Sequence, residues 1–524
     1  MGWAEKFLLG SLRKISDSTL PVFEMSATEQ QQQPSPCGPM NQISSALLEQ
    51  KKFQLKTTTT IVRHTPILSH AWAESAVQEK EIKIDQQLQQ NQSLESSKHV
   101  VAYLVPENGW QEMHGFLGDS HWCAPRKISH CESESRPGYA SKLAHEFEDT
   151  PEVLARKVTL LATLIRQSSS CLIYSGAGIS TSSGINDYAS QCGSVALENQ
   201  QRPKLRSPYE AQPTLAHRGV VSLYNSNLVK YWIQQNHDGL PQKAGLPQHA
   251  INEIHGAWYD PSNPVVAMSG NLRGDLFQDM LNWEEKTDLT IAMGTTMCGM
   301  NSDRVFVTVA KKGKRAAIQK LTSQLPPSSP IGGVIINLQQ TQYDSISCLR
   351  IFSKLDTVME MLVRELGLPP LTSLAEYSTY SLDSAGIIPE IEDVFEVRYD
   401  RNGSLIRDSS SDNHEQSHWS SLFRTISQKI HSSTTKSRES NPSEQNPTTT
   451  LDLRIGSRVK LVSGPHEGDE GEVIGKNRDG HYRIQFMHRI GKAGVRKPFE
   501  TVMGSWWVEA AVRGTVPMIP VVNL

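Results

Sequence analysis

The chain has 524 residues, a formal net charge of −3 and seven cysteines. This length exceeds one ordinary domain and predicts two or three globular units joined by linkers. The small net charge argues against a protein that coats nucleic acid over its whole surface. No run reaches the roughly 18 apolar residues of a membrane span. An odd number of scattered cysteines favours a reduced intracellular compartment, the nucleus or the cytoplasm, over a disulfide scaffold.

The first part of the chain has the composition of a tail. Residues 1–135 are rich in glutamine and serine and offer little apolar surface to bury. We therefore predict that this segment is mostly disordered. It contains two histidines and two cysteines whose spacing matches no common zinc pattern, and we interpret them as loop residues. They are His121, Cys123, His130 and Cys131.

An ordered domain is expected to begin near Tyr139. Thr150, followed by Pro and Glu, has the pattern of a helix start, because Thr can cap the first turn and Pro is tolerated there. Apolar residues then recur at helical spacing from Leu154 to Ile165. The apolar run Cys171–Tyr174 follows and predicts a buried parallel strand. This order of elements predicts an α/β domain with a doubly wound, Rossmann-like parallel sheet.

A glycine-rich loop comes directly after this strand. It reads Gly176, Ala177, Gly178 and Ile179, and its next glycine is Gly184. Glycines at this place allow a tight turn and bring backbone N–H groups close to a ligand, and such groups favour a pyrophosphate. The spacing differs from the ordinary dinucleotide fingerprint. The alternative interpretation is a turn that only ends the strand.

The run from Cys171 to Tyr188 resembles the signature of the sirtuin family. That signature joins a Gly-Ala-Gly-Ile-Ser loop to an Ile-Pro-Asp-Phe-Arg segment, and here the second segment reads Ile185-Asn186-Asp187-Tyr188-Ala189. The resemblance implies that the loop binds NAD, with Asp187 and Tyr188 as further cofactor contacts. Ala189 stands where the family has an arginine.

A second motif follows the next predicted strand, residues 229–233. Asn236 and Asp238 offer an amide and a carboxylate that suit a ribose or a carboxamide, although turn chemistry beside Gly239 is an alternative. The segment resembles the sirtuin Gln-Asn-Ile-Asp-Gly-Leu-His motif, with His237 in the Ile position. By resemblance, Gln235 to Asp238 contact the cofactor, and Asn236 and Asp238 also serve catalysis.

His255 is the candidate general base. It lies in Glu253-Ile254-His255-Gly256, which resembles the family's Glu-Leu-His-Gly. An imidazole that titrates near neutrality suits the removal of a proton from a ribose hydroxyl. A single one of seventeen histidines would by itself be read as structural, but this one follows two other motifs in the family's order.

The chain departs from the family after His255. Sirtuins usually carry two Cys-x-x-Cys pairs there for a structural zinc, but this chain has no cysteine between Cys192 and Cys298. We therefore predict no metal site. The family's peptide-pairing Phe-Gly-Glu is matched by Met268-Ser269-Gly270. This match implies that the substrate contacts Val266, Met268 and Ser269.

Further cofactor contacts are implied by resemblance at three places in the chain. The predicted strand 289–293 ends in Gly294, Thr295 and Thr296, like the family's Gly-Thr-Ser, and the strand 333–337 ends in Asn337, the ribose contact. Leu355 stands at the adenine position. The sirtuin-like NAD-binding catalytic domain is thus predicted to span residues 136–368, with the reduced small domain included.

The rest of the chain is predicted to hold a second, smaller unit. Residues 369–450 have the composition of a linker with a short hairpin near 395–406. Residues 451–513 alternate like short strands, near 458–462, 470–474, 481–486 and 505–508, and resemble a small SH3-like β-barrel. Residues 514–524 are predicted to be a tail. A basic loop of this unit suits RNA or an acidic protein segment, or is a solvated hairpin tip. Its basic residues are Arg489, Lys492, Arg496 and Lys497.

These features together predict an NAD-dependent protein lysine deacetylase or deacylase of sirtuin type. NAD is the expected cofactor, and an acyl-lysine protein or peptide is the expected substrate. The acyl group would pass to ADP-ribose as nicotinamide leaves. Two alternatives stay open: an NAD-dependent ADP-ribosyltransferase or NAD hydrolase, and a non-catalytic NAD-binding interaction protein.

Overall fold

The computed structural model describes residues 109–524 except 137, 140–141, 187–206, 268–269, 323–329, 372–380, 407–448 and 491–494. The predictions of disorder for residues 1–108 and of a linker for 407–448 lie outside the described residues. Within the described ranges, none of the helices combines the length and the apolar character needed to span a bilayer.

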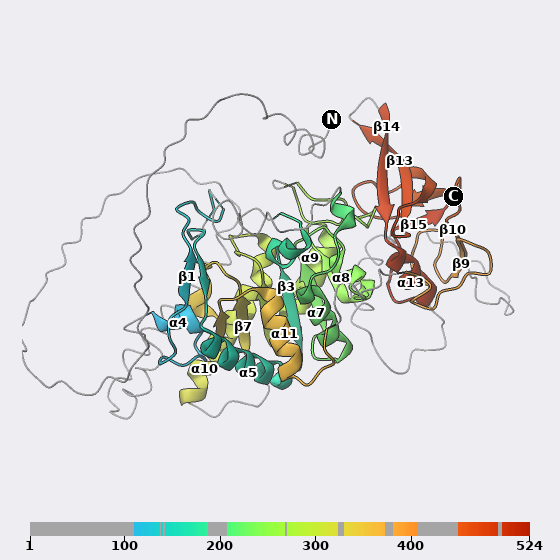
Figure 1. The fold of residues 1–524 in the computed structure, drawn as a ribbon. Coiled ribbons are helices and arrows are strands. Elements are labelled where there is room, and N and C mark those ends of the chain that lie inside the picture. Colours follow the sequence, from blue (N-terminus) through green and yellow to red (C-terminus); the bar gives the residue numbers. More distant parts are fainter. Residues whose placement is uncertain are drawn as a thin grey trace, which may run out of the picture. The chain divides into compact units, whose positions relative to one another are not determined.

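A parallel sheet of six strands forms the centre of the first folded region (Figure 1). The strands are β3 (Cys171–Ser175), β4 (Tyr231–Gln234), β5 (Ile251–Glu253), β6 (Leu289–Met293), β7 (Gly332–Ile336) and β8 (Leu349–Ile351). Their order is β5-β4-β3-β6-β7-β8. The chain therefore starts in the middle, builds one half outward and returns to build the other. This order confirms the predicted doubly wound fold and places its switch point between β3 and β6.

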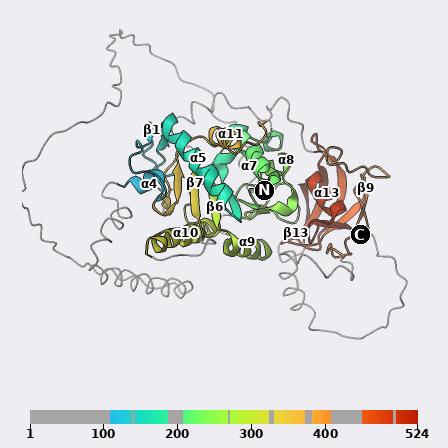
Figure 2. The ribbon, with the colours of Figure 1, turned by 90° about the horizontal axis from the view of Figure 1, so that it is seen from below.

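Helices cover both faces of this sheet (Figure 2). One face carries α5 (Pro151–Gln167), α7 (Leu215–Asn225) and α11 (Leu355–Glu365), and the other carries α9 (Gly274–Lys286) and α10 (Arg304–Thr322). Alternate strand residues face the two layers, as the pleat requires. Ile173 belongs to the first core cluster and Leu172 to the second. Helix α5 begins as predicted, because Thr150 Oγ1 accepts a hydrogen bond from Val153 N.

Order begins earlier than predicted. The helix α4 (Trp110–His114) and the strands β1 (Arg126–Ser129) and β2 (Glu146–Glu148) lie partly within the segment that composition marked as disordered. Phe116 N and Leu117 N donate to the backbone oxygens of residues 347 and 348, beside β8. Lys157 of α5 donates to Met113 O at 3.0 Å and forms a buried ion pair with Asp149 at 2.7 Å. The prediction was wrong for residues 109–135 because the partners of this segment lie outside it, from β2 and α5 to residues 347 and 348, which are more than 200 residues away.

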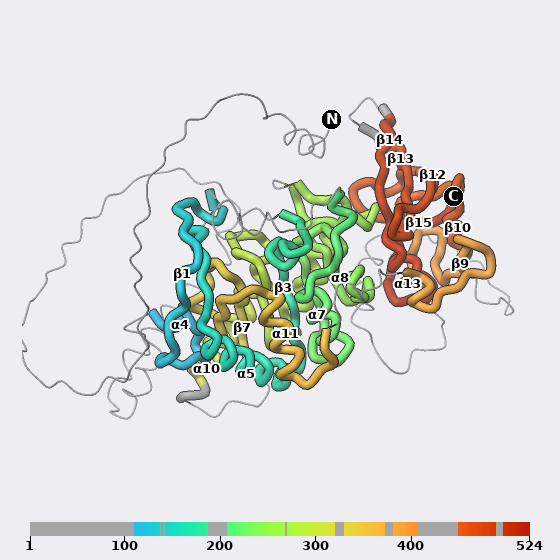
Figure 3. The backbone as a smooth tube through the Cα atoms, viewed as in Figure 1, coloured from blue at the N-terminus to red at the C-terminus, as the bar shows by residue number. Residues whose placement is uncertain are grey.

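The C-terminal region is antiparallel. Its sheet contains β11 (Arg458–Leu461), β12 (Glu470–Lys476), β13 (Tyr482–Ile490), β14 (Val495–Met503) and β15 (Val521–Asn523), in the order β14-β13-β12-β11-β15. A separate pair joins β9 (Val394–Val397) to β10 (Thr449–Asp452). We call residues 394–406 and 449–524 the β domain. Figure 3 traces its strands along the backbone. Closure into an SH3-like barrel stays a prediction.

Three details of the β domain differ from the sequence prediction. Residues 505–508 begin the helix α13 (Ser505–Arg513) and are not a strand. Residues 521–523 pair with β11 as β15, so the predicted tail contributes to the sheet. The hairpin predicted at 395–406 keeps only its turn, with an isolated bridge between Tyr399 and Leu405, because β9 pairs with β10. Alternation of apolar residues alone cannot distinguish a short helix with buried Trp506 and Val508 from a strand.

Candidate functional site

Most of the predicted site residues follow the carboxyl ends of parallel strands. The glycine loop follows β3, residues 235–238 follow β4, His255 follows β5, residues 294–296 follow β6 and Asn337 follows β7. In a doubly wound sheet these ends form one edge, and ligands bind there beside the switch point. The fold therefore brings five separate motifs to one edge of the sheet.

The glycine loop packs directly on the loop that follows β6. Gly178 N donates to Gly294 O at 2.8 Å, and Gly176 N donates to Met293 O at 3.1 Å. A Cβ at Gly178 would lie 2.8 Å from Gly294 Cα, which is closer than real Cβ atoms approach backbone. Glycine is therefore required here by a loop crossing. Because the N–H groups of Gly176 and Gly178 donate within the protein, a pyrophosphate would need other donors.

Asn236 and Asp238 tie the loop after β4 to the loop after β3. Asn236 Nδ2 donates to Gly176 O at 3.1 Å and to Ser180 Oγ at 3.0 Å. The buried Asp238 carboxylate accepts from Ser180 Oγ at 2.6 Å and from Gln234 Nε2 at 3.2 Å. It also accepts from Leu240 N at 3.1 Å, which is the turn chemistry that the sequence offered as an alternative. Asp238 therefore orders this corner of the site.

The next loops are joined in the same way. Thr295 Oγ1 donates to Gln235 Oε1 at 3.2 Å, and Asn337 Nδ2 donates to Thr295 O at 3.1 Å. These two bonds connect the loops after β4, β6 and β7. Leu355, the predicted adenine contact, is buried in the same core cluster as Ile179. Both side chains thus contribute to the packed wall beneath the glycine loop.

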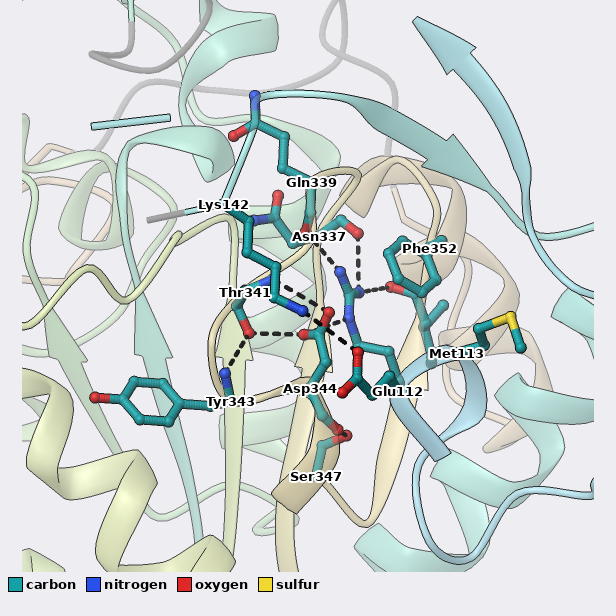
Figure 4. Close-up of polar contacts among 12 residues, drawn as sticks. Glu112, Met113, Lys142, Asn337, Gln339, Thr341, Tyr343, Asp344, Ser347 and Phe352 are labelled. Carbon is teal, nitrogen blue, oxygen red and sulfur yellow. Dashed lines mark hydrogen bonds and ion pairs between the residues drawn. The ribbon is translucent and has the colours of Figure 1, made fainter. Parts of the chain in front are cut away.

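The Asn337 loop is held by a buried ion pair (Figure 4). Arg350 Nε lies 2.9 Å from Asp344 Oδ1, and neither side chain is exposed by more than 1%. The remaining guanidinium N–H groups donate to the backbone oxygens of Asn337, Gln339 and Ile351 at 2.6 to 2.9 Å. Since all of these acceptors flank the loop, the pair fixes the path of the chain that carries Asn337.

His255 is partly buried and joined to a hydrogen-bonded chain of side chains. Its Nε2 lies 3.2 Å from Ser302 Oγ, and Ser302 Oγ lies 2.9 Å from the Tyr174 hydroxyl. That hydroxyl donates to Asp303 Oδ1 at 2.7 Å. Burial, with a smaller effect of His237, lowers the pKa of His255 from 6.5 to about 4. The imidazole is therefore neutral at neutral pH and able to accept a proton.

The residues behind His255 were not found from the sequence. Tyr174 reads as one apolar residue of a strand, and Ser302 and Asp303 precede a helix. One signal was available for Asp303, because an acidic residue before a helix often caps it. Its carboxylate accepts from Gly299 N at 2.9 Å and Met300 N at 2.8 Å, just before α10. The contact with Tyr174 depends on the tertiary fold.

His237 lies close behind the catalytic candidate. Its Nδ1 donates to Gly256 O at 2.8 Å, and its backbone oxygen accepts from Trp258 N at 2.9 Å. Burial lowers the pKa of His237 below its ordinary value of 6.5. This ring therefore fixes the chain that follows His255.

Of the predicted substrate contacts, the structure describes one. Val266 N donates to His255 O at 2.9 Å, so this segment runs directly beside the candidate base. Met268 and Ser269 lie outside the described residues, as do Asp187 and Tyr188 of the second signature segment.

Residues 257–264 stand where the family's zinc cysteines would begin. Side-chain hydrogen bonds fix the path of this segment. Asp260 Oδ1 accepts from Ser262 N at 2.8 Å and from Ser262 Oγ at 2.6 Å, and Asn263 Nδ2 donates to Glu253 O at 3.0 Å. The β domain, which belongs to the same compact unit, covers this segment. The Tyr259 ring lies 5.1 Å from that of Trp506, and Tyr259 O accepts from Gly504 N at 2.9 Å.

Comparison with known proteins places this site in a family. No family model matches the chain. A relative named "NAD-dependent protein deacetylase Sirt6" from Drosophila melanogaster is 30% identical over 283 residues, which cover 45% of this chain and 83% of the relative. The chain belongs to the sirtuin family.

Other sirtuins match a smaller share of their own length. "NAD-dependent protein deacetylase sirtuin-7" from Mus musculus is 34% identical over 258 residues, which cover 42% of this chain. The chain spans 62% of the length of this relative. A solved structure described as "Sir2-p53 peptide-NAD+" is 20% identical to this chain. The aligned region covers 40% of this chain and 98% of the chain in that structure. Its TM-score of 0.32 is too low to support a conclusion.

Proposed function

We propose that this sirtuin is an NAD-dependent protein lysine deacylase. The observation that carries this proposal is the partly buried, neutral His255 at the sheet edge, whose Nε2 lies 3.2 Å from Ser302 Oγ and whose backbone oxygen accepts from Val266 N. A base in this state suits a proton transfer from a hydroxyl group. Val266 N donates to His255 O, so the segment that contains Val266 lies beside the base. An extended acyl-lysine peptide bound along this segment would therefore lie close to His255.

The polar groups at this edge fit NAD. Amide, hydroxyl and carboxylate groups from four loops converge there, and these are the groups that orient a ribose or a carboxamide. Asn236, Thr295 and Asn337 would hold the cofactor, with Asp238 keeping Asn236 and Ser180 in place. When bound, NAD supplies the ADP-ribosyl acceptor of the acyl group, and nicotinamide is the group that leaves. His255 takes the proton from a ribose hydroxyl during the transfer.

Product analysis by mass spectrometry tests this function. The full chain is incubated with NAD and a mixed library of acyl-lysine peptides, beside His255→Ala and the exposed-histidine control His121→Ala. We expect acylated ADP-ribose and free nicotinamide from the wild type and the control. The rate for His255→Ala should fall about 10²–10⁴-fold, as is typical when a general base is lost.

Other products would support the alternatives. Nicotinamide released equally without acylated peptide would indicate an NAD hydrolase, and peptide carrying ADP-ribose would indicate a transferase. Cofactor binding with no nicotinamide release would indicate a non-catalytic NAD-binding protein.

The β domain is further proposed to contact an acidic partner, either a protein segment or RNA. Arg496 and Lys497 of β14 are exposed, and Lys492 of the same ribbon lies outside the described residues. Such contacts weaken steeply with salt, so binding of an acidic peptide or an RNA oligomer at two salt concentrations tests this part. The five described cysteines are unpaired, which supports a reduced site in the nucleus or cytoplasm.

A further inference from the structure

A cluster of metal-ligand side chains lies in the β domain, away from the NAD site. His466, Asp469 and His488 each present one ligand atom, and these atoms lie within 4.8 Å of one another. Across the residues that the structure describes, no other group of three or more His, Cys, Asp or Glu side chains meets this condition. The cluster joins the loop between β11 and β12 to the strand β13.

Both imidazoles present the same nitrogen to the same carboxylate oxygen. His488 Nδ1 lies 2.6 Å from Asp469 Oδ2, and His466 Nδ1 lies 3.7 Å from it. The two rings are stacked, with their centroids 3.9 Å apart. A hydrogen-bonded pair of His488 and Asp469 would need only one imidazole. The second ring, held parallel to the first with its Nδ1 toward the same oxygen, is what a shared cation requires.

The distances are close to those of a tetrahedral zinc site. Zinc binds imidazole nitrogen and carboxylate oxygen at about 2.0–2.2 Å, so two ligand atoms of a tetrahedral site lie about 3.3 Å apart. The observed separations of 2.6 and 3.7 Å lie on either side of this value. The third separation, between the two imidazole nitrogens, is no more than 4.8 Å, so side-chain adjustments without a change of fold would bring the three atoms into place.

The backbone holds the loop in this position before any ligand binds. Gly468 N donates to Leu461 O at 2.8 Å, Leu461 N donates to Asp469 O at 3.0 Å, and Asp469 N donates to His466 O at 3.0 Å. Gly464 and Gly468 both have φ of +84°, a left-handed conformation that favours glycine. The His488 ring lies 4.8 Å from the Phe499 ring, which fixes it from the side. A preformed ligand set lowers the cost of binding.

We propose that His466, Asp469 and His488 form a zinc site that fastens the β11–β12 loop to β13. Two imidazoles and one carboxylate suit zinc, a metal that imidazole binds well and that is usually four-coordinate in proteins. The side chain of His466 is 38% exposed, whereas those of Asp469 and His488 are 14% and 11% exposed. The open side next to His466 leaves room for water as the fourth ligand. The site is separate from the cysteine module that sirtuins usually carry.

Zinc titration of the whole chain tests the site. Untagged protein is treated with EDTA, dialysed, and titrated with zinc chloride by calorimetry, and its metal content is then measured after a second dialysis. We expect one zinc per chain and a higher melting temperature with zinc. His466→Ala should bind zinc at least about tenfold more weakly, since even outer-shell changes cost this much. Asp469→Asn keeps the side-chain shape and should show the same loss of zinc affinity. It serves as the test variant if His466→Ala does not fold.

The control is His121→Ala, which removes an exposed histidine whose Nδ1 lies 2.9 Å from the Asp119 carboxylate outside the cluster. Its zinc affinity should equal that of the wild type. The site is overturned if the wild type binds no zinc at one equivalent, or if His466→Ala and Asp469→Asn bind as the wild type does. Binding of copper or nickel without zinc would also overturn it. Because no readout uses deacylation, these outcomes are independent of the enzyme's activity.

Discussion

At the scale of single residues, the environment of His255 decides its chemistry. The sequence marks an imidazole that titrates near neutrality, whereas burial lowers the pKa of His255 to about 4. His237, which the sequence places among the cofactor contacts, is also removed from solvent, and this lowers its pKa. The His255 ring is therefore neutral across the range in which an ordinary histidine titrates.

The pH profile of deacylation should follow from this state. The base works only when unprotonated, so kcat/KM should stay flat from neutral pH down through 6.5 and fall only as the pH approaches about 4. His237→Ile should move this acid limb to higher pH, because the charge of His237 is one of the causes that depress the pKa of His255. Rates are measured at constant ionic strength, with His121→Ala as the control. A midpoint near 6.5 in the wild type would show that His255 is not shielded from water.

At the scale of elements, the site depends on loops that cross at close range. The glycine loop after β3 and the loop after β6 touch through Gly178 and Gly294, and Gly294 has φ of +59°. The sequence assigned Gly178 to a loop whose backbone approaches a pyrophosphate, and Gly294 to a contact with the cofactor. The structure adds that they are needed to let two backbones pass each other.

Gly178→Val should therefore weaken both NAD binding and the fold. The new Cβ would meet Gly294 backbone at 2.8 Å, so the two loops must separate, and overpacking of this kind costs about 1–3 kcal/mol. Calorimetric NAD affinity and the melting temperature are the measurements. Gly274→Val is the matched control, since a Cβ at Gly274 meets nothing within 4 Å. Equal NAD affinity in the two folded variants would remove the glycine loop from the cofactor site.

The loop after β7 has a different support, the ion pair of Arg350 and Asp344. Arg350→Met should lower the free energy of unfolding by about 3–5 kcal/mol, because it leaves a buried carboxylate without its partner. Arg458→Met is the control, since Arg458 and Glu470 form a pair at 2.6 Å that is 65% and 43% exposed. Such exposed pairs contribute about 0–1 kcal/mol. The expectation fails if denaturant unfolding gives similar losses for both variants.

At the scale of the whole molecule, the β domain buttresses the segment that follows His255. Tyr259 and Trp506 are both 1% exposed and share a core cluster with Val502. His481 of the β domain packs on both rings, at 5.0 and 4.9 Å between centroids. Aromatic side chains of the β domain thus pack against residues 257–264, the segment in which sirtuins usually have their zinc cysteines.

Trp506→Ala should lower the melting temperature strongly, since emptying a buried Trp position typically costs about 3–5 kcal/mol. Deacylation should also fall, because Trp258 N holds His237 O next to His255, the proposed base. Ile455→Ala, which shortens a side chain of the β domain that is 78% exposed, should change stability by no more than about 0.5 kcal/mol. Identical melting curves for the two variants would contradict a buttressing role of the β domain.

The sequence alone determined the features that local patterns encode. Buried strands read as apolar runs, so β3, β6 and β7 were predicted within a residue or two, and Thr150 marked the start of α5. The doubly wound fold followed from their order. The motif residues were predicted because only certain residue types can provide the chemistry of the site. Their position at the carboxyl edge of the sheet follows from the parallel arrangement of the strands.

Only the tertiary structure decided the features that depend on distant partners. Residues 109–135 are ordered by contacts with β2, Lys157 and residues near 347, and α13 is a helix although its first residues alternate like a strand. The edge strands β5 and β8 have three residues each, too few for a periodic signal. The chain Tyr174–Ser302–His255, the lowered pKa of His255 and the meeting of His466 with His488 all arise from burial and from neighbours remote in sequence. No local pattern carries that information, because the low-dielectric surroundings exist only once the chain has folded.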